Sequence, residues 1–265
     1  MSASYEDKVK ALRRRLRKME GAVVAFSGGV DSSVLASLAF EELGNRMVAA
    51  TAVSPGTPGR DLDAAAEVCR THGIPHSTVE TREFEDAAFL SNPEDRCYIC
   101  KKLLYEALTA LADRLSFAFV VEGTNASDLG GHRPGYRASQ ENPRVATPLI
   151  EEGFTKEEVR RLAASLCLQS ANKPASACLA SRVPAGVSFT PELMRRIDAA
   201  EEVVREFAKG QVRVRHHGEL ARIELDGKEL SVALEHRLEI DRRLRELGWK
   251  FVSLDLLGYR TGGAK

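Results

Sequence analysis

The sequence carries no excess of charge of either sign. Its 265 residues include 38 Lys and Arg and 38 Asp and Glu, so the formal net charge is zero. Proteins that bind nucleic acid or an anionic membrane over a broad face usually carry a surplus of positive charge. The balance therefore predicts neither a nucleic-acid partner nor a membrane partner.

Long apolar runs are missing as well. No stretch approaches the roughly 20 residues of a membrane-spanning helix, and residues 1–20 are charged and lack the apolar core of a signal peptide. The sequence thus predicts a soluble, cytoplasmic protein. With 43% hydrophobic residues it has enough apolar side chains for a full core, in one large domain or a large and a small one.

Cysteine is scarce, with five residues. Structural disulfides are rare in the cytoplasm, so cysteines with informative spacing are interpreted as metal ligands or nucleophiles. Cys69, in mid-helix, and Cys167, at a helix end, have apolar neighbours and are predicted to be inert structural thiols. Cys97, Cys100 and Cys178 are the candidates for chemistry.

The chain up to residue 80 alternates strand and helix signals. Apolar strand segments and amphipathic helices follow in the order β-α-β-α-β, which predicts an α/β fold with a doubly wound, mostly parallel sheet. After Pro184 the order becomes α-β-β-α-β, typical of a small α+β domain. We therefore predict domains at residues 1–184 and 185–265. The expected strands of the first are Ala22–Phe26, Met47–Val53, His76–Glu80, Phe117–Glu122 and Val145–Leu149.

A glycine turn joins the first predicted strand to the first helix of the sheet. Glycines allow backbone N–H groups to approach a phosphate, and the helix N-terminus favours negative charge. The turn has no lysine after its glycines, so it is neither a G-x-x-x-x-G-K-[ST] loop nor a G-x-G-x-x-G loop. The alternative is a Gly-Ser turn without a ligand. The residues predicted to bind phosphate are Ser27, Gly28, Gly29, Asp31, Ser32 and Ser33.

Ligands of parallel sheets bind at the carboxyl ends of the strands. That rim includes Ser54, after the second strand, and the segment Gly123, Thr124 and Asn125, after the fourth. Residues 130–142, rich in Gly, Arg and Pro and containing Arg133, are predicted to form a functional loop over the site. Asp31 is expected to hold Mg²⁺ beside the phosphates, to cap the helix, or both.

Three further groups are candidates for chemistry. Cys97-x-x-Cys100 is half of a metal site, or a pair of buried small side chains. Cys178 is flanked by Lys173, Ser181 and Arg182, and the two cations, Lys173 and Arg182, would lower the pKa of its thiol. Arg213 and Arg215 alternate on a strand, where they either form a phosphate seat or lie on a solvated face.

These motifs resemble known families. S-G-G-x-D-S-S is similar to the PP-loop of the N-type ATP pyrophosphatases, also called adenine nucleotide alpha hydrolase-like proteins, which split ATP into AMP and pyrophosphate. Over about residues 5–260 the chain resembles the LarE family, through this loop, Glu122-Gly-Thr-Asn, Arg133-Pro-Gly, Lys173-Pro-Ala-Ser-Ala-Cys-Leu-Ala-Ser-Arg and Val212-Arg-Val-Arg-His-His-Gly.

The resemblance implies an ATP-dependent sulfur transferase of nickel-pincer nucleotide cofactor synthesis. Its small-molecule substrate would be pyridinium-3,5-biscarboxylic acid mononucleotide, a carboxylate of which is adenylated and converted to a thiocarboxylate. A homo-oligomer is implied. The nucleotide would contact the loop, Ser54, Gly123, Thr124, Asn125 and Arg133. The catalytic set would be Asp31, Cys97, Cys100, Lys101 and Cys178, and the substrate set Ser181, Arg182, Glu201, Arg213, Arg215 and Glu224.

The source of sulfur has two alternatives in this family. Members with three cysteines hold a [4Fe-4S] cluster whose open iron carries sulfide from an outside source, and Cys97, Cys100 and Cys178 match that kind. Other members sacrifice the cysteine that corresponds to Cys178. The competing functions are a PP-loop tRNA thiolase, an amide-forming ligase, or an inactive nucleotide- or metal-binding protein.

Overall fold

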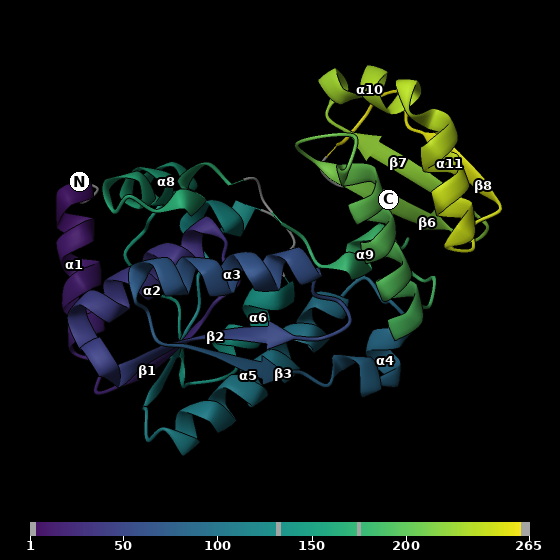
Figure 1. The fold of residues 1–265 in the computed structure, drawn as a ribbon. Coiled ribbons are helices and arrows are strands. Elements are labelled where there is room, and N and C mark those ends of the chain that lie inside the picture. The colour runs from purple at the N-terminus through teal and green to yellow at the C-terminus, as the bar shows by residue number, and fades with distance from the viewer. Residues whose placement is uncertain (1–3, 131–133, 174–175, 261–265) are drawn as a thin grey trace. The chain divides into compact units, whose positions relative to one another are not determined.

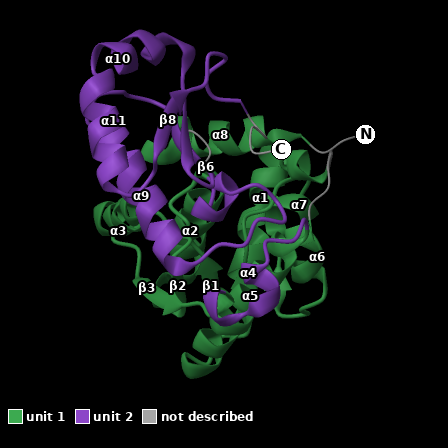
Figure 2. Cartoon of the chain, turned by 90° about the vertical axis from the view of Figure 1, so that its right-hand side faces the viewer, with its two compact units in different colours: residues 1–83, 95–176 green, residues 84–94, 177–265 purple. Residues whose placement is uncertain are grey.

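The computed structural model describes residues 4–130, 134–173 and 176–260. The chain forms two compact units, residues 1–83 with 95–176 and residues 84–94 with 177–265 (Figure 2). The predicted division at residue 184 differs from these units in two short segments. The segment 84–94 joins the second unit because the rings of Phe84 and Phe89 lie 5.7 and 5.2 Å from that of Phe189.

The first unit is built on a sheet of five parallel strands in the order β3-β2-β1-β4-β5, of which β1, β2 and β3 are labelled in Figure 1. The chain starts in the middle of the sheet and winds to one edge before it crosses to the other. This confirms the predicted doubly wound sheet. The strands are β1 (Ala22–Ala25), β2 (Met47–Val53), β3 (His76–Glu80), β4 (Phe119–Val121) and β5 (Val145–Ala146).

Helices cover both faces of this sheet. Because successive strand residues point to opposite sides, Val24 packs into a core with the helices α1, α2, α3 and α8, whereas Val23 packs into a second core with α5 and α6. No helix in the described part of the chain is long and apolar enough to span a membrane. The helices are α1 (Tyr5–Arg17), α2 (Val30–Leu43), α3 (Gly59–His72), α5 (Arg96–Arg114), α6 (Pro134–Gln140), α7 (Pro148–Glu151) and α8 (Lys156–Ser165).

Two predicted segments of this unit have a different conformation. The predicted strand Val145–Leu149 stops after two residues, because Pro148 begins α7, and proline favours the first turn of a helix. Residues 134–140 of the predicted functional loop form α6. Arg133, which precedes this helix, lies outside the described residues.

The second unit contains a three-stranded sheet in the order β6-β7-β8. Strands β6 and β7 are antiparallel, and β8 runs parallel to β7. The predicted α-β-β-α-β order is thus present in a small mixed sheet with helices. The elements are α4 (Ala87–Leu90), α9 (Pro191–Arg205), β6 (Val212–His217), β7 (Leu220–Leu225), α10 (Leu230–Glu235), α11 (Arg237–Glu246) and β8 (Phe251–Leu254).

Candidate active site

The loop between β1 and α2 is shaped by glycine. Gly28 has a φ of +66°, in the left-handed region, and a Cβ atom there would lie 3.2 Å from the backbone of Ala65 on α3. A larger residue would therefore strain the loop and push it from α3. Gly29 is the N-cap of α2 and provides no side-chain cap, so the first N–H groups of the helix are left for a ligand.

Serine side chains line the same turn. Ser32 Oγ accepts the N–H of Ser27 at 3.2 Å and donates to the carbonyl of Gly29 at 3.1 Å. Ser33 is fully buried, and its Oγ has no hydrogen-bond partner among the described residues. The loop is thus held in shape by its own hydroxyl groups, and the resulting geometry is that of an anion site.

Asp31 is bound on both carboxylate oxygens. Asn125 Nδ2 donates to Oδ1 at 3.1 Å, and Lys156 Nζ lies 2.5 Å from Oδ2. A Cβ atom on Gly123 would lie 3.2 Å from Asp31 Cβ, so the segment after β4 packs closely on the loop. Asp31 therefore contacts the Gly123–Asn125 segment, which was predicted to lie beside it at the carboxyl ends of the strands. Its side chain does not cap α2.

Two lysines at this loop have a place that the sequence did not indicate. Lys156 lies at the start of α8, where Thr155 and Glu158 form a capping box, a local pattern that indicates a helix start and no ligand contact. Lys173 was assigned to the surroundings of Cys178. Its Nζ instead lies 3.5 Å from the carbonyl oxygen of Gly28 and 3.6 Å from Asp61 Oδ1. The local sequence around each lysine does not indicate a contact with the loop, which lies 125 or 145 positions away along the chain.

The remaining nucleotide candidates lie at strand ends. Ser54 follows β2, and its Oγ accepts the N–H of Gly56 at 3.2 Å. Thr124 follows β4, and its N–H donates to Glu122 Oε1 at 3.2 Å. Both residues are therefore at the carboxyl rim of the parallel sheet, where ligands of such sheets bind.

The first turn of α5 carries the Cys97-x-x-Cys100 pair. Residues three apart lie on one side of a helix, and Cys97 is exposed while Cys100 is partly buried. Lys101 Nζ lies 4.0 Å from Glu122 Oε2 and 5.5 Å from the centre of the Tyr105 ring. Burial alone would lower the pKa of the Lys101 ammonium. The nearby Tyr105, Glu122 and Cys100 have the opposite and larger effect, so the pKa is raised and the ammonium stays charged.

Cys178 belongs to the second unit and is exposed. The backbone around it is held by Arg182, whose guanidinium is wholly buried. Arg182 Nη1 donates to the carbonyls of Ala177 and Cys178 at 2.6 and 3.1 Å, and its other nitrogens pair with Glu201 at 2.8 and 2.9 Å. The guanidinium thus holds the segment in place and is neutralised by a carboxylate.

The two arginines of β6 are also buried. Arg213 is 2% exposed and Arg215 is 4% exposed, so the alternative of a solvated strand face is wrong. Arg215 donates twice to Glu224 Oε2, at 3.0 and 2.8 Å, and once to the carbonyl of Ser181 at 2.8 Å. Arg213 donates to the carbonyl of Val212 and lies 5.3 Å from the ring of Tyr259.

Positive charge exceeds negative charge in this buried cluster. Among the described residues, the second unit buries three arginines, Arg182, Arg213 and Arg215, with two glutamates, Glu201 and Glu224. Burial would raise the pKa of Glu201, but the charges and hydrogen bonds of the neighbouring arginines lower it below its usual value. The cluster can therefore accept an additional anion.

The two other cysteines differ from each other. Cys69 is buried, and burial raises the pKa of its thiol to about 11, in agreement with an inert structural role. Cys167 is exposed and has a φ of 54°. The expected apolar surroundings of Cys167 are therefore wrong, since the chain leaves the helix α8 and turns the side chain outward.

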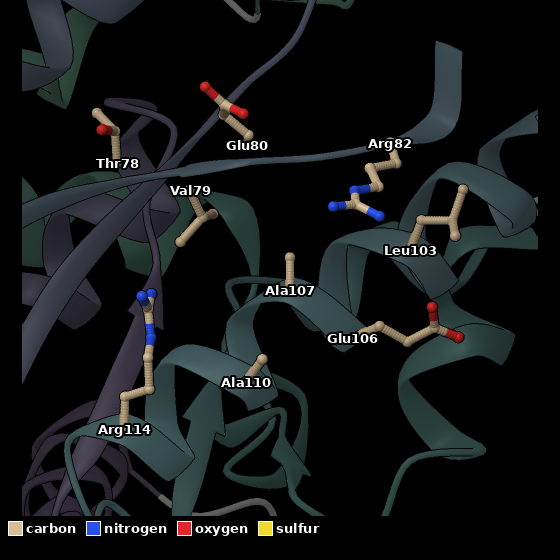
Figure 3. A pocket seen from close by; sticks show the side chains of 9 residues that line it. All are labelled: Thr78, Val79, Glu80, Arg82, Leu103, Glu106, Ala107, Ala110 and Arg114. Carbon is tan, nitrogen blue, oxygen red and sulfur yellow. The ribbon is translucent and has the colours of Figure 1, made fainter. Parts of the chain in front are cut away.

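A pocket of about 480 Å³ lies between the edge strand β3 and α5 (Figure 3). Arg82 and Arg114 line it together with Glu80 and Glu106. None of the residues predicted for the site lines this pocket. Within the described residues, no group of three or more His, Cys, Asp or Glu side chains is close enough to hold a metal ion.

Comparisons with known proteins agree with the loop geometry. Residues 8–100 match the family model described as asparagine synthase. The chain is 38% identical over 259 residues to the uncharacterized protein slr1717 of Synechocystis, covering 97% of this chain and 96% of that protein. It is 32% identical over 235 residues to the tRNA-specific 2-thiouridylase MnmA of Xanthobacter autotrophicus, covering 74% of this chain and 59% of that enzyme.

A further relative extends over nearly the whole chain. The pyridinium-3,5-bisthiocarboxylic acid mononucleotide synthase of Lactiplantibacillus plantarum is 32% identical over 262 residues, which are 98% of this chain and 94% of that enzyme. The match therefore includes both the loop at residues 27–33 and the arginine cluster of the second unit. The chain belongs to the LarE family of ATP-dependent sulfur transferases, within the PP-loop ATP pyrophosphatases.

Proposed function

We propose that the protein adenylates a carboxylate of pyridinium-3,5-biscarboxylic acid mononucleotide and converts it to a thiocarboxylate, in the synthesis of the nickel-pincer nucleotide cofactor. The observation that carries this proposal is the loop at residues 27–33, with its uncapped helix start, in a chain that aligns almost end to end with a synthase of the bisthiocarboxylated product.

Adenylation solves a problem of leaving groups. A carboxylate oxygen is a poor leaving group, so sulfur can displace it only after AMP has been attached. The carboxylate attacks the α-phosphorus of ATP, and the electron pair of the broken P–O bond leaves with pyrophosphate. The N–H groups at the start of α2 and the hydroxyls of Ser27 and Ser32 would bind this developing charge.

Mg²⁺ fits the carboxylate at the loop. Magnesium in phosphoryl sites is held by one or two carboxylates together with the phosphates, and Asp31 supplies one such group, partly exposed and beside the helix start. When bound, the ion would neutralise phosphate charge. In this structure, Asn125 and Lys156 hold the Asp31 carboxylate in its orientation.

The arginine cluster of the second unit suits the phosphate of the mononucleotide. Arg213 and Arg215 lie on one face of β6, and the excess of positive charge among the buried groups favours an anion. We propose that Arg182 does not contact the substrate directly, because its nitrogens already bind Glu201 and the backbone at Cys178. It positions that segment, with Ser181 beside it.

Sulfur would be delivered through a [4Fe-4S] cluster held by Cys97, Cys100 and Cys178. The donor chemistry fits, because thiolates ligate such clusters and three of them leave one iron open. Cys97 and Cys100 share one side of the first turn of α5, and Cys178 is exposed on the other unit. When bound, the cluster would carry the sulfide to be transferred.

Variants of the cysteines test this delivery route. Replacing Cys97, Cys100 or Cys178 by Ala is expected to remove most of the iron and multiple-turnover activity together. Cys167→Ala is the matched control, since Cys167 is also an exposed thiol and lies outside the proposed set. Full iron content in all three variants would overturn the cluster proposal.

ATP–pyrophosphate exchange tests the adenylation itself. We expect exchange that depends on the pyridinium mononucleotide, with AMP and a thiocarboxylated product when sulfide is added. Exchange that depends on tRNA instead would indicate a tRNA thiolase, which the balanced charge of the chain disfavours. Exchange with neither would contradict the proposed substrate.

A further inference from the structure

The loop at residues 27–33 contains no lysine, yet two lysines from distant parts of the chain reach it. Lys156 contacts Asp31 from 125 positions downstream, and Lys173 contacts the carbonyl of Gly28 from 145 positions downstream. We propose that Lys156 and Lys173 bind the terminal phosphates of ATP and stabilise pyrophosphate as it leaves. This rests on the proposed function only in that ATP is split into AMP and pyrophosphate.

Three hydrogen bonds fix the backbone at and around Lys156. The Thr155 hydroxyl accepts the N–H of Glu158 at 3.3 Å, and the Glu158 carboxylate accepts the N–H of Thr155 at 2.8 Å. The N–H of Lys156 itself donates to Ser127 Oγ at 2.9 Å. With its backbone fixed, the side chain can exchange one nearby acceptor for another without movement of α8.

Lys173 reaches the other side of the loop. Asp61, in the first turn of α3, lies 3.6 Å from its ammonium, and Ser176 Oγ hydrogen-bonds to the second oxygen of the same carboxylate. Four positions along α3, Ala65 packs on Gly28. One face of α3 therefore supports both the glycine turn and the lysine beside it.

The two ammonium groups remain open to a ligand. The side chain of Lys156 is 39% exposed and that of Lys173 is 27% exposed. Among the residues that the structure describes, Lys156 is paired with the carboxylate of Asp31 and Lys173 with that of Asp61. A polyphosphate carries more charge and more acceptor oxygens than one carboxylate, so it competes well for both lysines.

The proposed role of the two lysines in the departure of pyrophosphate involves no proton transfer. The attacking carboxylate forms its bond to the α-phosphorus while the bond to the bridging oxygen breaks, and the electron pair stays on pyrophosphate. Lys156 and Lys173 keep their protons and stabilise the charge that builds up on the leaving group. They would thus substitute for the lysine of a G-x-x-x-x-G-K-[ST] loop, which binds the same phosphates.

Calorimetric titration with three probes, ATP, inorganic pyrophosphate and AMP, tests the proposal. ATP and inorganic pyrophosphate contain the phosphates at issue, whereas AMP does not. Lys156→Met and Lys173→Met are each expected to weaken binding of ATP and pyrophosphate about 10- to 100-fold, the range for loss of a charge-assisted hydrogen bond, and to leave AMP binding unchanged. Lys10→Met, at an exposed position of α1, is the control and should change neither.

A double variant separates this role from neutralisation of Asp31. If Lys156 only compensated the charge of Asp31, then Asp31→Asn combined with Lys156→Met would bind pyrophosphate as Asp31→Asn alone does, and the proposal would be wrong. Equal losses for AMP and ATP, or unchanged pyrophosphate affinity in both single variants, would also overturn it. Because the readout is binding of ATP and pyrophosphate, a failure to form thiocarboxylate would refute the proposed substrate and leave this inference standing.

Discussion

Two side chains at the start of α2 allow a test of whether the loop at residues 27–33 acts on ATP. Asp31 and Ser32 lie at the start of α2, and the hydroxyl of Ser32 bridges Ser27 and Gly29. In the proposed reaction, Ser32 binds charge on the leaving pyrophosphate and Asp31 holds Mg²⁺ beside it. Their removal should therefore affect the reaction more than the fold.

We expect Ser32→Ala to slow pyrophosphate release by about 100-fold or more, as does loss of one donor in a preorganised anion site. Asp31→Ala is expected to slow it to a similar degree, because it removes the carboxylate proposed to hold Mg²⁺ beside the phosphates. Pyrophosphate release in single-turnover reactions measures this, with thermal unfolding as the check on the fold. Asp113→Ala, at a 64% exposed carboxylate, is the control. Unchanged release in both loop variants would refute the role of the loop.

The two arginines of β6 each interact with a buried glutamate. Arg215 donates to Glu224, and the charge of Arg213 acts on Glu201. Arg213 serves as the probe of the substrate phosphate, with Gln as a replacement that keeps a polar side chain at the position.

Arg213→Gln is expected to weaken binding of the pyridinium mononucleotide by roughly 1.5–3 kcal/mol, the range for a hydrogen bond to a charged group, with ATP affinity unchanged. Titration with each ligand measures the two affinities separately. An equal loss for ATP would assign Arg213 to the nucleotide site instead.

At the scale of elements, several candidate site residues lie at the starts of helices. Residue Lys156 is the first of α8 and depends on the cap at Thr155, and Cys97 and Cys100 lie in the first turn of α5. A cap that fixes the helix start also fixes what the first side chain can reach. Stability and ligand binding should therefore be linked at α8.

Thr155→Ala is expected to lower the free energy of unfolding by about 1 kcal/mol, as loss of an N-cap does, and to weaken pyrophosphate binding through Lys156. Thr190→Ala removes the equivalent cap of α9, where Thr190 accepts the N–H of Leu193 at 3.2 Å. That control should show a similar stability loss with unchanged pyrophosphate binding. Equal effects of both variants on pyrophosphate would contradict the link.

Elements with clear end signals could be predicted with their observed bounds. The strands Met47–Val53 and His76–Glu80 begin and end at the predicted residues. The prediction of a strand at 145–149 was wrong in its second half. An apolar run does not distinguish a strand from a helix, and Pro148 starts a helix there.

The site was only partly predictable for a related reason. Asp31, Gly123 and Asn125 lie at strand ends, and the topology of a parallel sheet brings such ends together. Lys156 and Lys173 come from segments whose local pattern describes a cap and an irregular stretch. Their contacts with the loop arise from the packing of α8 and α3, which no local signal encodes.

For the molecule as a whole, buried charge makes stability depend on pH. The pKa of Glu201 is lowered in the folded protein, although burial alone would raise it, because the pull of Arg182 and its neighbours is larger. A lowered pKa stabilises the fold above the usual value of 4.5. That contribution is lost as the pH falls below 4.5 and through the folded-state value.

Glu201→Gln should therefore lower the free energy of unfolding near pH 7 by about 3–5 kcal/mol, since it leaves Arg182 without its buried carboxylate. The difference from the wild type should shrink in acid below pH 4.5. Trp249, the single tryptophan, is buried in the second unit, so its fluorescence in urea titrations reports on the relevant unit. A difference independent of pH would refute this account.

The account as a whole is tested most directly by mass spectrometry after anaerobic reaction with ATP, sulfide and the pyridinium mononucleotide. We predict AMP, pyrophosphate and more than one thiocarboxylate per protein chain, with the mass of Cys178 unchanged. Absence of thiocarboxylate, or a single turnover with Cys178 lighter by about 34 Da through loss of its sulfur as H₂S, would contradict it.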